Sequence, residues 1–312
     1  MNDTVFVSVL VPILNEQESL PELHQRLRKA LQALGKPYEI IYVNDGSTDS
    51  TQQILEGFHR EAGHDGPVRV VEFNRNYGQH MALLAAMERS RGEIVITIDA
   101  DLQNPPEEIP RLVAKMEEGY EMVGTYRGRR KDSIFRTLPS YMVNKITGRL
   151  VGVKLRDWGC MLRAYRREIV DSMNMCGESA AFIPALAATF ARKVAEIEVA
   201  HEARKKGKTK YSLFKLLHLN FDLMTGFSLL PIQLIGFLGV VIASIGVVFA
   251  IFLFIRRLVV GPEVEGLFTL FAIDFVFMGL MLFALGVIGE YIGRIYQQVR
   301  GRPRFIVKKE LT

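Results

Sequence analysis

Ile94-Val95-Ile96-Thr97-Ile98 is an apolar run that leads directly into Asp99-Ala100-Asp101-Leu102-Gln103. Such a run is typical of a buried strand, so two carboxylates and an amide are expected at its carboxyl end. Mg²⁺ and Mn²⁺ prefer oxygen ligands of this kind and often complete their coordination shell with substrate phosphates. The residues also fit a polar turn before a helix, because Asn104-Pro105-Pro106-Glu107-Glu108 resembles a helix start.

Strand-like and helix-like segments alternate on the amino-terminal side of this run. The strand-like segments are 5–11, 38–43, 68–73 and 94–98, and the helix-like segments between them are 19–34, 50–61 and 78–89. This alternation predicts an α/β domain with a mostly parallel sheet covered by helices.

Polar clusters follow three of the predicted strands. Pro12 to Glu16 follow the first strand, Asn44 to Ser47 the second, and Asp99 to Gln103 the fourth. Ligands of parallel sheets bind at the carboxyl ends of the strands, so the three clusters together favour a site over a simple turn. Dinucleotide-binding and P-loop proteins are disfavoured, because no Gly-x-Gly-x-x-Gly turn is present and Gly207-Lys208-Thr209 lacks the earlier glycine.

The apolar residues, 49% of 312, are concentrated near the carboxyl terminus. Pro231–Ile255 carries no charge, and Gly266–Gly289 is interrupted only by Asp274. Each stretch exceeds the roughly 20 residues that cross a bilayer, which predicts a transmembrane hairpin, although two long core helices would share the pattern. An ionisable group is costly inside a membrane, so Asp274 is expected in an interhelical pair or an oligomer contact.

The distribution of charge indicates the orientation of this hairpin. Basic residues precede the first stretch and follow the second, which places both ends in the cytoplasm, although Arg256 and Arg257 between the stretches weaken the asymmetry. The net charge of +5 is interpreted as attraction to anionic lipids and phosphorylated substrates, with no nucleic-acid partner. The amino terminus shows no secretory signal, and Cys160 and Cys176 have no metal-like spacing.

Two further segments, 133–151 and 211–227, combine apolar and basic residues in an amphipathic pattern. They fit helices that lie in the membrane interface, or helices packed on the sheet. The predicted organisation is therefore an α/β core with the candidate ligand site at 1–132, interfacial helices at 133–152 and 211–228, the rest of the same domain at 153–210, the transmembrane hairpin at 229–293 and a cytoplasmic tail at 294–312.

Five motifs together resemble those of family 2 glycosyltransferases that act on polyprenyl phosphates: Val-Pro-Ile-Leu-Asn-Glu (11–16), Asn-Asp-Gly-Ser-Thr-Asp (44–49), Asn-Arg-Asn-Tyr-Gly-Gln (74–79), Asp-Ala-Asp-Leu-Gln (99–103) and Gly-Cys-Met-Leu-Arg-Ala-Tyr-Arg-Arg (159–167). The likeness covers nearly the whole chain and is greatest to members that transfer 4-deoxy-4-formamido-L-arabinose. It implies a GT-A, Rossmann-like fold, a UDP-sugar donor, Mg²⁺ or Mn²⁺ as cofactor, and inversion at the anomeric carbon.

The same resemblance assigns roles to residues of this chain. Catalysis would fall to Asp99 and Asp101, and the metal to Asp101, Asp99 and Gln103. The nucleotide pocket would be lined by Pro12, Asn15, Glu16 and Asp45, with Asp45 accepting a hydrogen bond from uracil. Asn44 departs from the family pattern, where many members have a second aspartate, and this makes the base contact less certain.

The expected acceptor, undecaprenyl phosphate, is already an anion, so its attack on the sugar needs no general base of the kind that an alcohol requires. Two phosphate-bearing substrates in one cleft do require cationic groups to offset their repulsion. The candidates for the acceptor phosphate are Arg127, Arg136, Arg163, Arg204 and Lys210.

The sequence thus predicts a multi-pass enzyme of the bacterial inner membrane with a cytoplasmic catalytic domain, as in lipid A modification. An undecaprenyl-phosphate glucosyltransferase for O-antigen modification is the alternative within this class, and a non-enzymatic nucleotide sensor or a lipid flippase subunit represents other classes. Relatives form homo-oligomers, and residues 302–307 are expected to add a strand between subunits.

Overall fold

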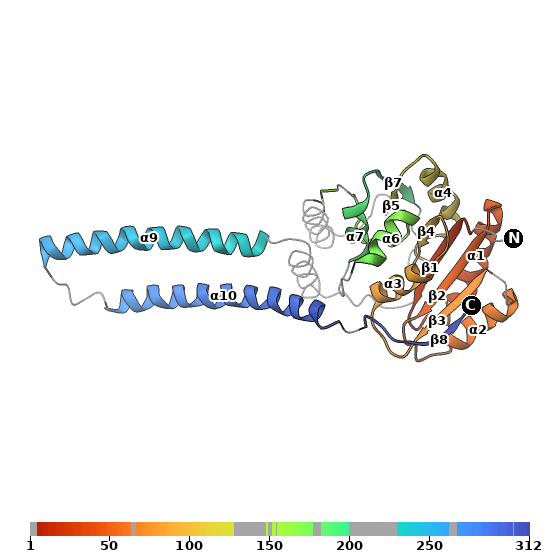
Figure 1. The fold of residues 1–312 in the computed structure, drawn as a ribbon, viewed down its shortest axis with the longest axis horizontal. Coiled ribbons are helices and arrows are strands. Elements are labelled where there is room, and N and C mark those ends of the chain that lie inside the picture. The colour runs from red at the N-terminus through yellow and green to blue at the C-terminus, as the bar shows by residue number, and fades with distance from the viewer. Residues whose placement is uncertain are drawn as a thin grey trace. The chain divides into compact units, whose positions relative to one another are not determined.

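The structure is a computed structural model that describes residues 5–63, 67–127, 148, 152–153, 155–176, 182–199, 230–261, 267–301 and 303–312. The chain divides into two compact units. One comprises Met1–Leu216 with Arg302–Thr312, and the other comprises Leu217–Gly301. The first unit holds the sheet, and the second holds two long helices (Figure 1).

The first unit is built on an eight-stranded sheet of order β7-β5-β6-β4-β1-β2-β3-β8. The strands are β1 Val7–Ile13, β2 Tyr38–Asn44, β3 Val68–Phe73, β4 Ile94–Thr97, β5 Met122–Arg127, β6 Arg163–Arg166, β7 Val194–Val199 and β8 Val307–Leu311. Strands β4, β1, β2 and β3 are mutually parallel, whereas β6 and β8 each pair antiparallel with their neighbours. The carboxyl ends of four parallel strands therefore meet along one edge.

Helices cover both faces of this sheet (Figure 1). They are α1 Leu20–Leu34, α2 Thr51–Ala62, α3 Gln79–Arg89, α4 Ile109–Glu117, α6 Arg167–Met175 and α7 Ile183–Phe190, with a short 3₁₀ turn, η1 Pro106–Glu108. One apolar core joins α1, α2 and α4 to every second residue of β1. On the other face α6 packs against α3 and α7. Both faces of the central strands are buried, which explains their continuous apolar sequence.

The sequence-based elements of the amino-terminal half are confirmed. The predicted strand at 68–73 matches β3, and the other predicted strands and helices up to β4 differ from the observed bounds by at most two residues at either end. The mostly parallel α/β sheet is therefore the predicted one. These elements are set by apolar periodicity and local turn signals, which the sequence displays directly.

The strand near the carboxyl terminus lies later in the sequence than the segment predicted. The sequence suggested that residues 302–307 could add a strand between subunits, whereas the strand that the structure describes is β8, Val307–Leu311, which pairs with β3 of its own chain. A contact of residues 302–307 with another subunit stays a prediction. Phe305 stacks on Phe73 with ring centroids 5.0 Å apart, and the backbone N–H of Asn74 donates to the carbonyl oxygen of Ile306. The chain thus leaves the second unit and returns to the edge of the sheet beside the end of β3.

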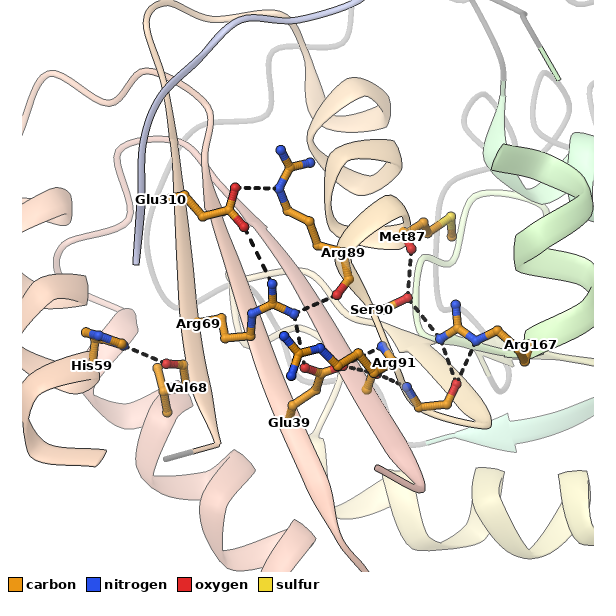
Figure 2. A network of polar contacts seen from close by, with 12 residues as sticks. Glu39, His59, Val68, Arg69, Met87, Arg89, Ser90, Arg91, Arg167 and Glu310 are labelled. Atoms are coloured by element: carbon orange, nitrogen blue, oxygen red, sulfur yellow. Dashed lines mark hydrogen bonds and ion pairs between the residues drawn. The ribbon is translucent and has the colours of Figure 1, made fainter. Parts of the chain in front are cut away.

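Charged side chains are paired at the amino-terminal end of the parallel strands (Figure 2). Glu39, 5% exposed, accepts hydrogen bonds from the Ser8 hydroxyl at 2.6 Å and the Arg91 backbone N–H at 2.7 Å. Arg69 donates to Glu39 and to Glu310 of β8, at 3.4 and 3.5 Å. This set of residues, called here the amino-edge network, links β1, β2, β3 and β8.

The second unit consists of α9 Leu230–Val260 and α10 Leu267–Val299, which pack against each other (Figure 1). Within the described residues, Phe277–Tyr296 of α10 is long and apolar enough to cross a membrane, with a mean hydropathy of 1.5. Most apolar side chains described on both helices are exposed, so water is a poor solvent for this unit. The predicted interfacial helices, 133–152 and 211–228, lie almost entirely outside the described residues.

Candidate functional site

The loops after β1 and β2 hold each other through hydrogen bonds between their polar residues. The side-chain oxygen of Asn15 accepts the backbone N–H of Thr48 at 2.8 Å, and the hydroxyl of Ser47 accepts the N–H of Asn15 at 2.9 Å. Asn15 has a φ of 56°, a left-handed conformation that Asn tolerates better than most residues. Asn15 and Glu16 therefore have defined positions at the carboxyl edge, whereas Pro12 is buried within β1.

Asp45 is turned toward the backbone of the loop after β3. Its carboxylate accepts the backbone N–H groups of Tyr77 at 2.7 Å and of Gly78 at 2.9 Å, just before α3 begins. Burial raises the pKa of this carboxyl group, although the two hydrogen bonds act in the opposite direction. The structure thus gives Asp45 the role of holding the backbone of the loop just before α3, and the contact with uracil stays a prediction.

Asn44, the departure from the family pattern, is also explained by local contacts. Its side-chain oxygen accepts the N–H of Ser47 at 2.9 Å, and its amide donates to Gln52 of α2 at the same distance. The amide is 1% exposed. An aspartate could accept from Ser47 but could not donate to Gln52, so Asn44 suits the turn between β2 and α2.

The loop after β4 alternates between inward and outward residues. Ala100, Leu102 and Asn104 are buried, whereas Asp99, Asp101 and Gln103 between them are partly exposed. Leu102 adopts a φ of 60°, which is unusual for such a residue, and its side chain enters the core beside α1 and α4. This arrangement directs all three predicted catalytic and metal-binding side chains away from the core. The strain at Leu102, on the order of 1–3 kcal/mol, is offset by burial of its side chain.

The contacts within this loop keep the polar side chains in place. The Asp101 carboxylate accepts the backbone N–H of Gln103 at 3.1 Å, which closes a local turn. Asn104 accepts a weak hydrogen bond from the thiol of Cys160 at 3.4 Å, and the same thiol lies 2.9 Å from the hydroxyl of Thr125. Cys160 is thus a buried residue that connects the loop to β5. The turn interpretation and the site interpretation of 99–103 are therefore compatible.

Gln79 is a site residue that sequence reasoning missed. Its amide nitrogen donates to the Asp99 carboxylate at 2.5 Å, which joins the loop after β3 to the loop after β4. The sequence did contain a signal, because 74–79 follow a predicted strand in the same way as the three clusters considered. The four loops at the carboxyl edge are thereby connected in one chain of hydrogen bonds.

The predicted cationic residues are not gathered in the described part of the site. Arg163 is completely buried, and its guanidinium donates to the carbonyl oxygens of Cys160 at 2.7 Å and Asp157 at 2.6 Å. These contacts give it a structural role, and its role at the acceptor phosphate stays a prediction. Arg127 ends β5 near the carboxyl edge, and Arg136, Arg204 and Lys210 lie outside the described residues.

The donor set at 99–103 fits a hard divalent cation. No group of three or more acidic, histidine or cysteine side chains converges within the part of the chain that the structure describes. Two carboxylates and an amide oxygen at most would come from this loop, and phosphates and water would supply the rest. Mg²⁺ is commonly bound in that way, by one or two carboxylates together with substrate phosphates, and Mn²⁺ accepts the same ligands.

An α/β sheet with oxygen-rich loops at its carboxyl edge is an architecture of enzymes that bind phosphorylated ligands. Residues 8–173 match the model of a family described as "Glycosyl transferase family 2". The chain belongs to glycosyl transferase family 2 and is a glycosyltransferase.

Curated relatives match over nearly the full length. The chain is 49% identical to the undecaprenyl-phosphate 4-deoxy-4-formamido-L-arabinose transferase of Shewanella sediminis, covering 98% of this chain and 93% of that protein. It is 50% identical to the protein of the same name from Proteus mirabilis, covering 97% and 93%. A solved structure, titled a crystal structure of a mycobacterial protein, matches with a TM-score of 0.50 and 20% identity over 71% of this chain and 73% of that one. The predicted family and GT-A fold class are confirmed.

Proposed function

We propose that this glycosyltransferase moves 4-deoxy-4-formamido-L-arabinose from a UDP-linked donor to undecaprenyl phosphate, with inversion, at the cytoplasmic face of the bacterial inner membrane. The observation that carries the proposal is the outward-facing set Asp99, Asp101 and Gln103 in a chain about half identical to the named relatives over nearly its full length. The exposed apolar helices of the second unit suit an enzyme whose acceptor is a lipid.

The metal is part of this proposal. Asp101 and Asp99 would hold Mg²⁺ or Mn²⁺, with Gln103 beside them, and the cation would supply charge neutralisation at the departing diphosphate. Asn15, Glu16 and Asp45 would organise the nucleotide end of the donor. The acceptor phosphate needs no proton removed before it attacks, so the chain mainly has to position and shield the reactants.

The acceptor end of the reaction is proposed to depend on Arg127, Arg136, Arg163, Arg204 and Lys210. Arg136→Ala and Lys210→Ala are expected to weaken the use of undecaprenyl phosphate more than donor binding, since both residues lie in or next to the predicted interfacial segments. Equal losses of donor affinity would contradict that division of the site.

The decisive experiment uses the full-length protein in nanodiscs with undecaprenyl phosphate and Mg²⁺ or Mn²⁺. UDP-linked 4-deoxy-4-formamido-L-arabinose, UDP-L-arabinose and UDP-glucose are supplied separately, and the lipid products are identified by mass spectrometry. We expect the formamido sugar to be transferred with the highest kcat/KM and the activity to disappear when EDTA is added. Preferential transfer of glucose would support the alternative glucosyltransferase, and donor binding without any product would support a nucleotide sensor.

A further inference from the structure

The start of α3 places an amide next to the outward-facing carboxylates. Gln79, the first residue of α3, is exposed, and its Nε2 donates to Oδ1 of Asp99 at 2.5 Å. Asp99 follows β4, whereas Gln79 follows β3, so this hydrogen bond joins two separate loops of the site. Sequence reasoning gave no role to Gln79.

The backbone that carries Gln79 is held by buried groups. Asp45 accepts the N–H groups of Tyr77 and Gly78, the two residues just before it. Gly46 packs against the backbone of this loop so closely that a Cβ at position 46 would lie 2.5 Å from the carbonyl carbon of Arg75. The Gln79 side chain therefore extends from a fixed base, which favours a role that needs defined geometry.

His80, the residue after Gln79, packs α3 against the start of α7. The ring of His80 meets that of Phe182, at the start of α7, edge to face with centroids 5.5 Å apart. Burial lowers the pKa of His80 to about 4, so the imidazole is neutral at physiological pH. His80 is therefore packed and uncharged. The contact described between α3 and Asp99 is made by Gln79.

The chemistry of Gln79 complements that of Asp99. An ionised carboxylate only accepts hydrogen bonds, whereas a primary amide has two N–H donors and an acceptor oxygen. Only one of those N–H groups has a hydrogen-bond partner among the residues that the structure describes. A sugar substituent that has both an N–H and a C=O, such as a formamido group, requires an acceptor and a donor side by side.

We propose that Gln79 positions Asp99 and hydrogen-bonds the sugar of the donor, and that it thereby helps the enzyme to select a sugar with an amide substituent. This inference rests on the proposed function, because the transferred group is taken to be a formamido sugar. Gln79 acts on the sugar and on Asp99, not on the nucleotide, which is assigned to the loops after β1 and β2.

The test compares Gln79→Glu and Gln79→Ala with the wild-type protein, all full-length and in nanodiscs with Mg²⁺. Gln79→Glu preserves the shape but places a second carboxylate against Asp99, and Gln79→Ala removes the amide. Gln53→Glu is the matched control, because Gln53 is an exposed glutamine of α2 outside the loops that form the candidate site. Affinities for UDP and for the UDP-linked formamido sugar are measured by calorimetry, and kcat and KM by product formation.

We expect both Gln79 variants to lose at least tenfold in kcat/KM for the formamido donor, while their affinity for UDP stays within twofold of wild type. Their preference for this donor over the matching 4-amino sugar should shrink, and Gln53→Glu should behave as wild type. Equal losses of affinity for UDP and for the UDP-sugar, or an unchanged donor preference, would overturn the inference.

The outcomes for the two proposals can be separated. If the wild-type protein binds the UDP-sugar but transfers nothing to undecaprenyl phosphate, the proposed function fails, and the binding measurements still test Gln79. If transfer occurs and the Gln79 variants keep full activity and selectivity, only the inference about Gln79 fails. If the wild-type protein binds no UDP-sugar, both proposals are wrong.

Discussion

The two edges of the parallel strands use carboxylates in opposite ways. At the amino-terminal edge, Glu39 and Glu310 are matched by Arg69, and Arg89 donates to Glu310 at 2.9 Å (Figure 2). At the carboxyl-terminal edge, Asp99 accepts a hydrogen bond from the Gln79 amide, Asp101 accepts one from the backbone N–H of Gln103, and both side chains are partly exposed. The first edge stabilises the fold, and the second is suited to receiving charge from a ligand.

This contrast follows from what each edge must do. A buried charge is tolerated only when it is paired and hydrogen-bonded, and the amino-edge network satisfies that condition with arginines and a hydroxyl. A site that binds a divalent cation instead needs carboxylates that a ligand can reach, and Asp99 and Asp101 are partly exposed. Substitutions at the amino edge should therefore change stability, and substitutions at the carboxyl edge should change activity.

The largest effect is expected at Asp101. Asp101→Asn should lower kcat/KM by roughly a thousandfold, about 4 kcal/mol of transition-state stabilisation, because a neutral amide is a poor ligand for a divalent cation. Asparagine can still accept the N–H of Gln103, so the thermal unfolding midpoint should stay near that of wild type. Initial rates with purified protein, together with a thermal melt, measure both. Activity near the wild-type level would remove Asp101 from the catalytic set.

The second-largest effect is expected on the stability of the fold, at Glu39. Glu39→Gln should reduce the free energy of unfolding by about 2–3 kcal/mol, because Arg69 would lose its buried partner and face an amide N–H instead. The activity of the protein that remains folded should be unchanged. Denaturant titration of the full-length protein and specific activity per folded molecule are the two measurements. A loss of activity without a loss of stability would break the proposed contrast between the edges.

Asp45 provides a further test of this contrast, because it lies at the candidate site but its carboxylate accepts hydrogen bonds from the backbone. Asp45→Asn retains one acceptor oxygen for two backbone N–H groups and should cost about 1–2 kcal/mol of stability. Because the same N–H groups position Gln79, the activity should also fall, by about tenfold, or 1.4 kcal/mol. Denaturation and initial-rate measurements on the same preparation would show whether the two losses occur together.

The smallest effect is expected in the exposed ion pair between Lys309 of β8 and Glu56 of α2, whose charged atoms lie 2.8 Å apart. Lys309→Met should change the free energy of unfolding by less than about 0.5 kcal/mol, because both side chains are partly exposed to water. Differential scanning calorimetry at low and high salt measures this. A loss comparable to that of Glu39→Gln would show that ordinary surface pairs matter as much as the buried network.

Much of the candidate site followed from strand order alone. The clusters after β1, β2 and β4 were predicted to converge because parallel strands end at one edge, and the structure brings these loops together. The same rule, applied to the segment after β3, would have included Gln79. The directions of the side chains could not be predicted in this way, since Asp45 turns toward the backbone of Tyr77, which lies far away in the sequence, and Arg163 turns toward the backbone of the nearby Asp157.

The sequence by itself determined the secondary structure of the amino-terminal half, the two apolar helices and the position of the acidic residues at the carboxyl end of β4. These features depend on residue periodicity and local turn chemistry, which act over a few neighbouring positions. Only the tertiary structure decided that β8 pairs with β3 of its own chain, that Asp45 holds the loop before α3 and that Gln79 contacts Asp99. Such contacts join residues that are distant along the chain, and they depend on how whole elements pack.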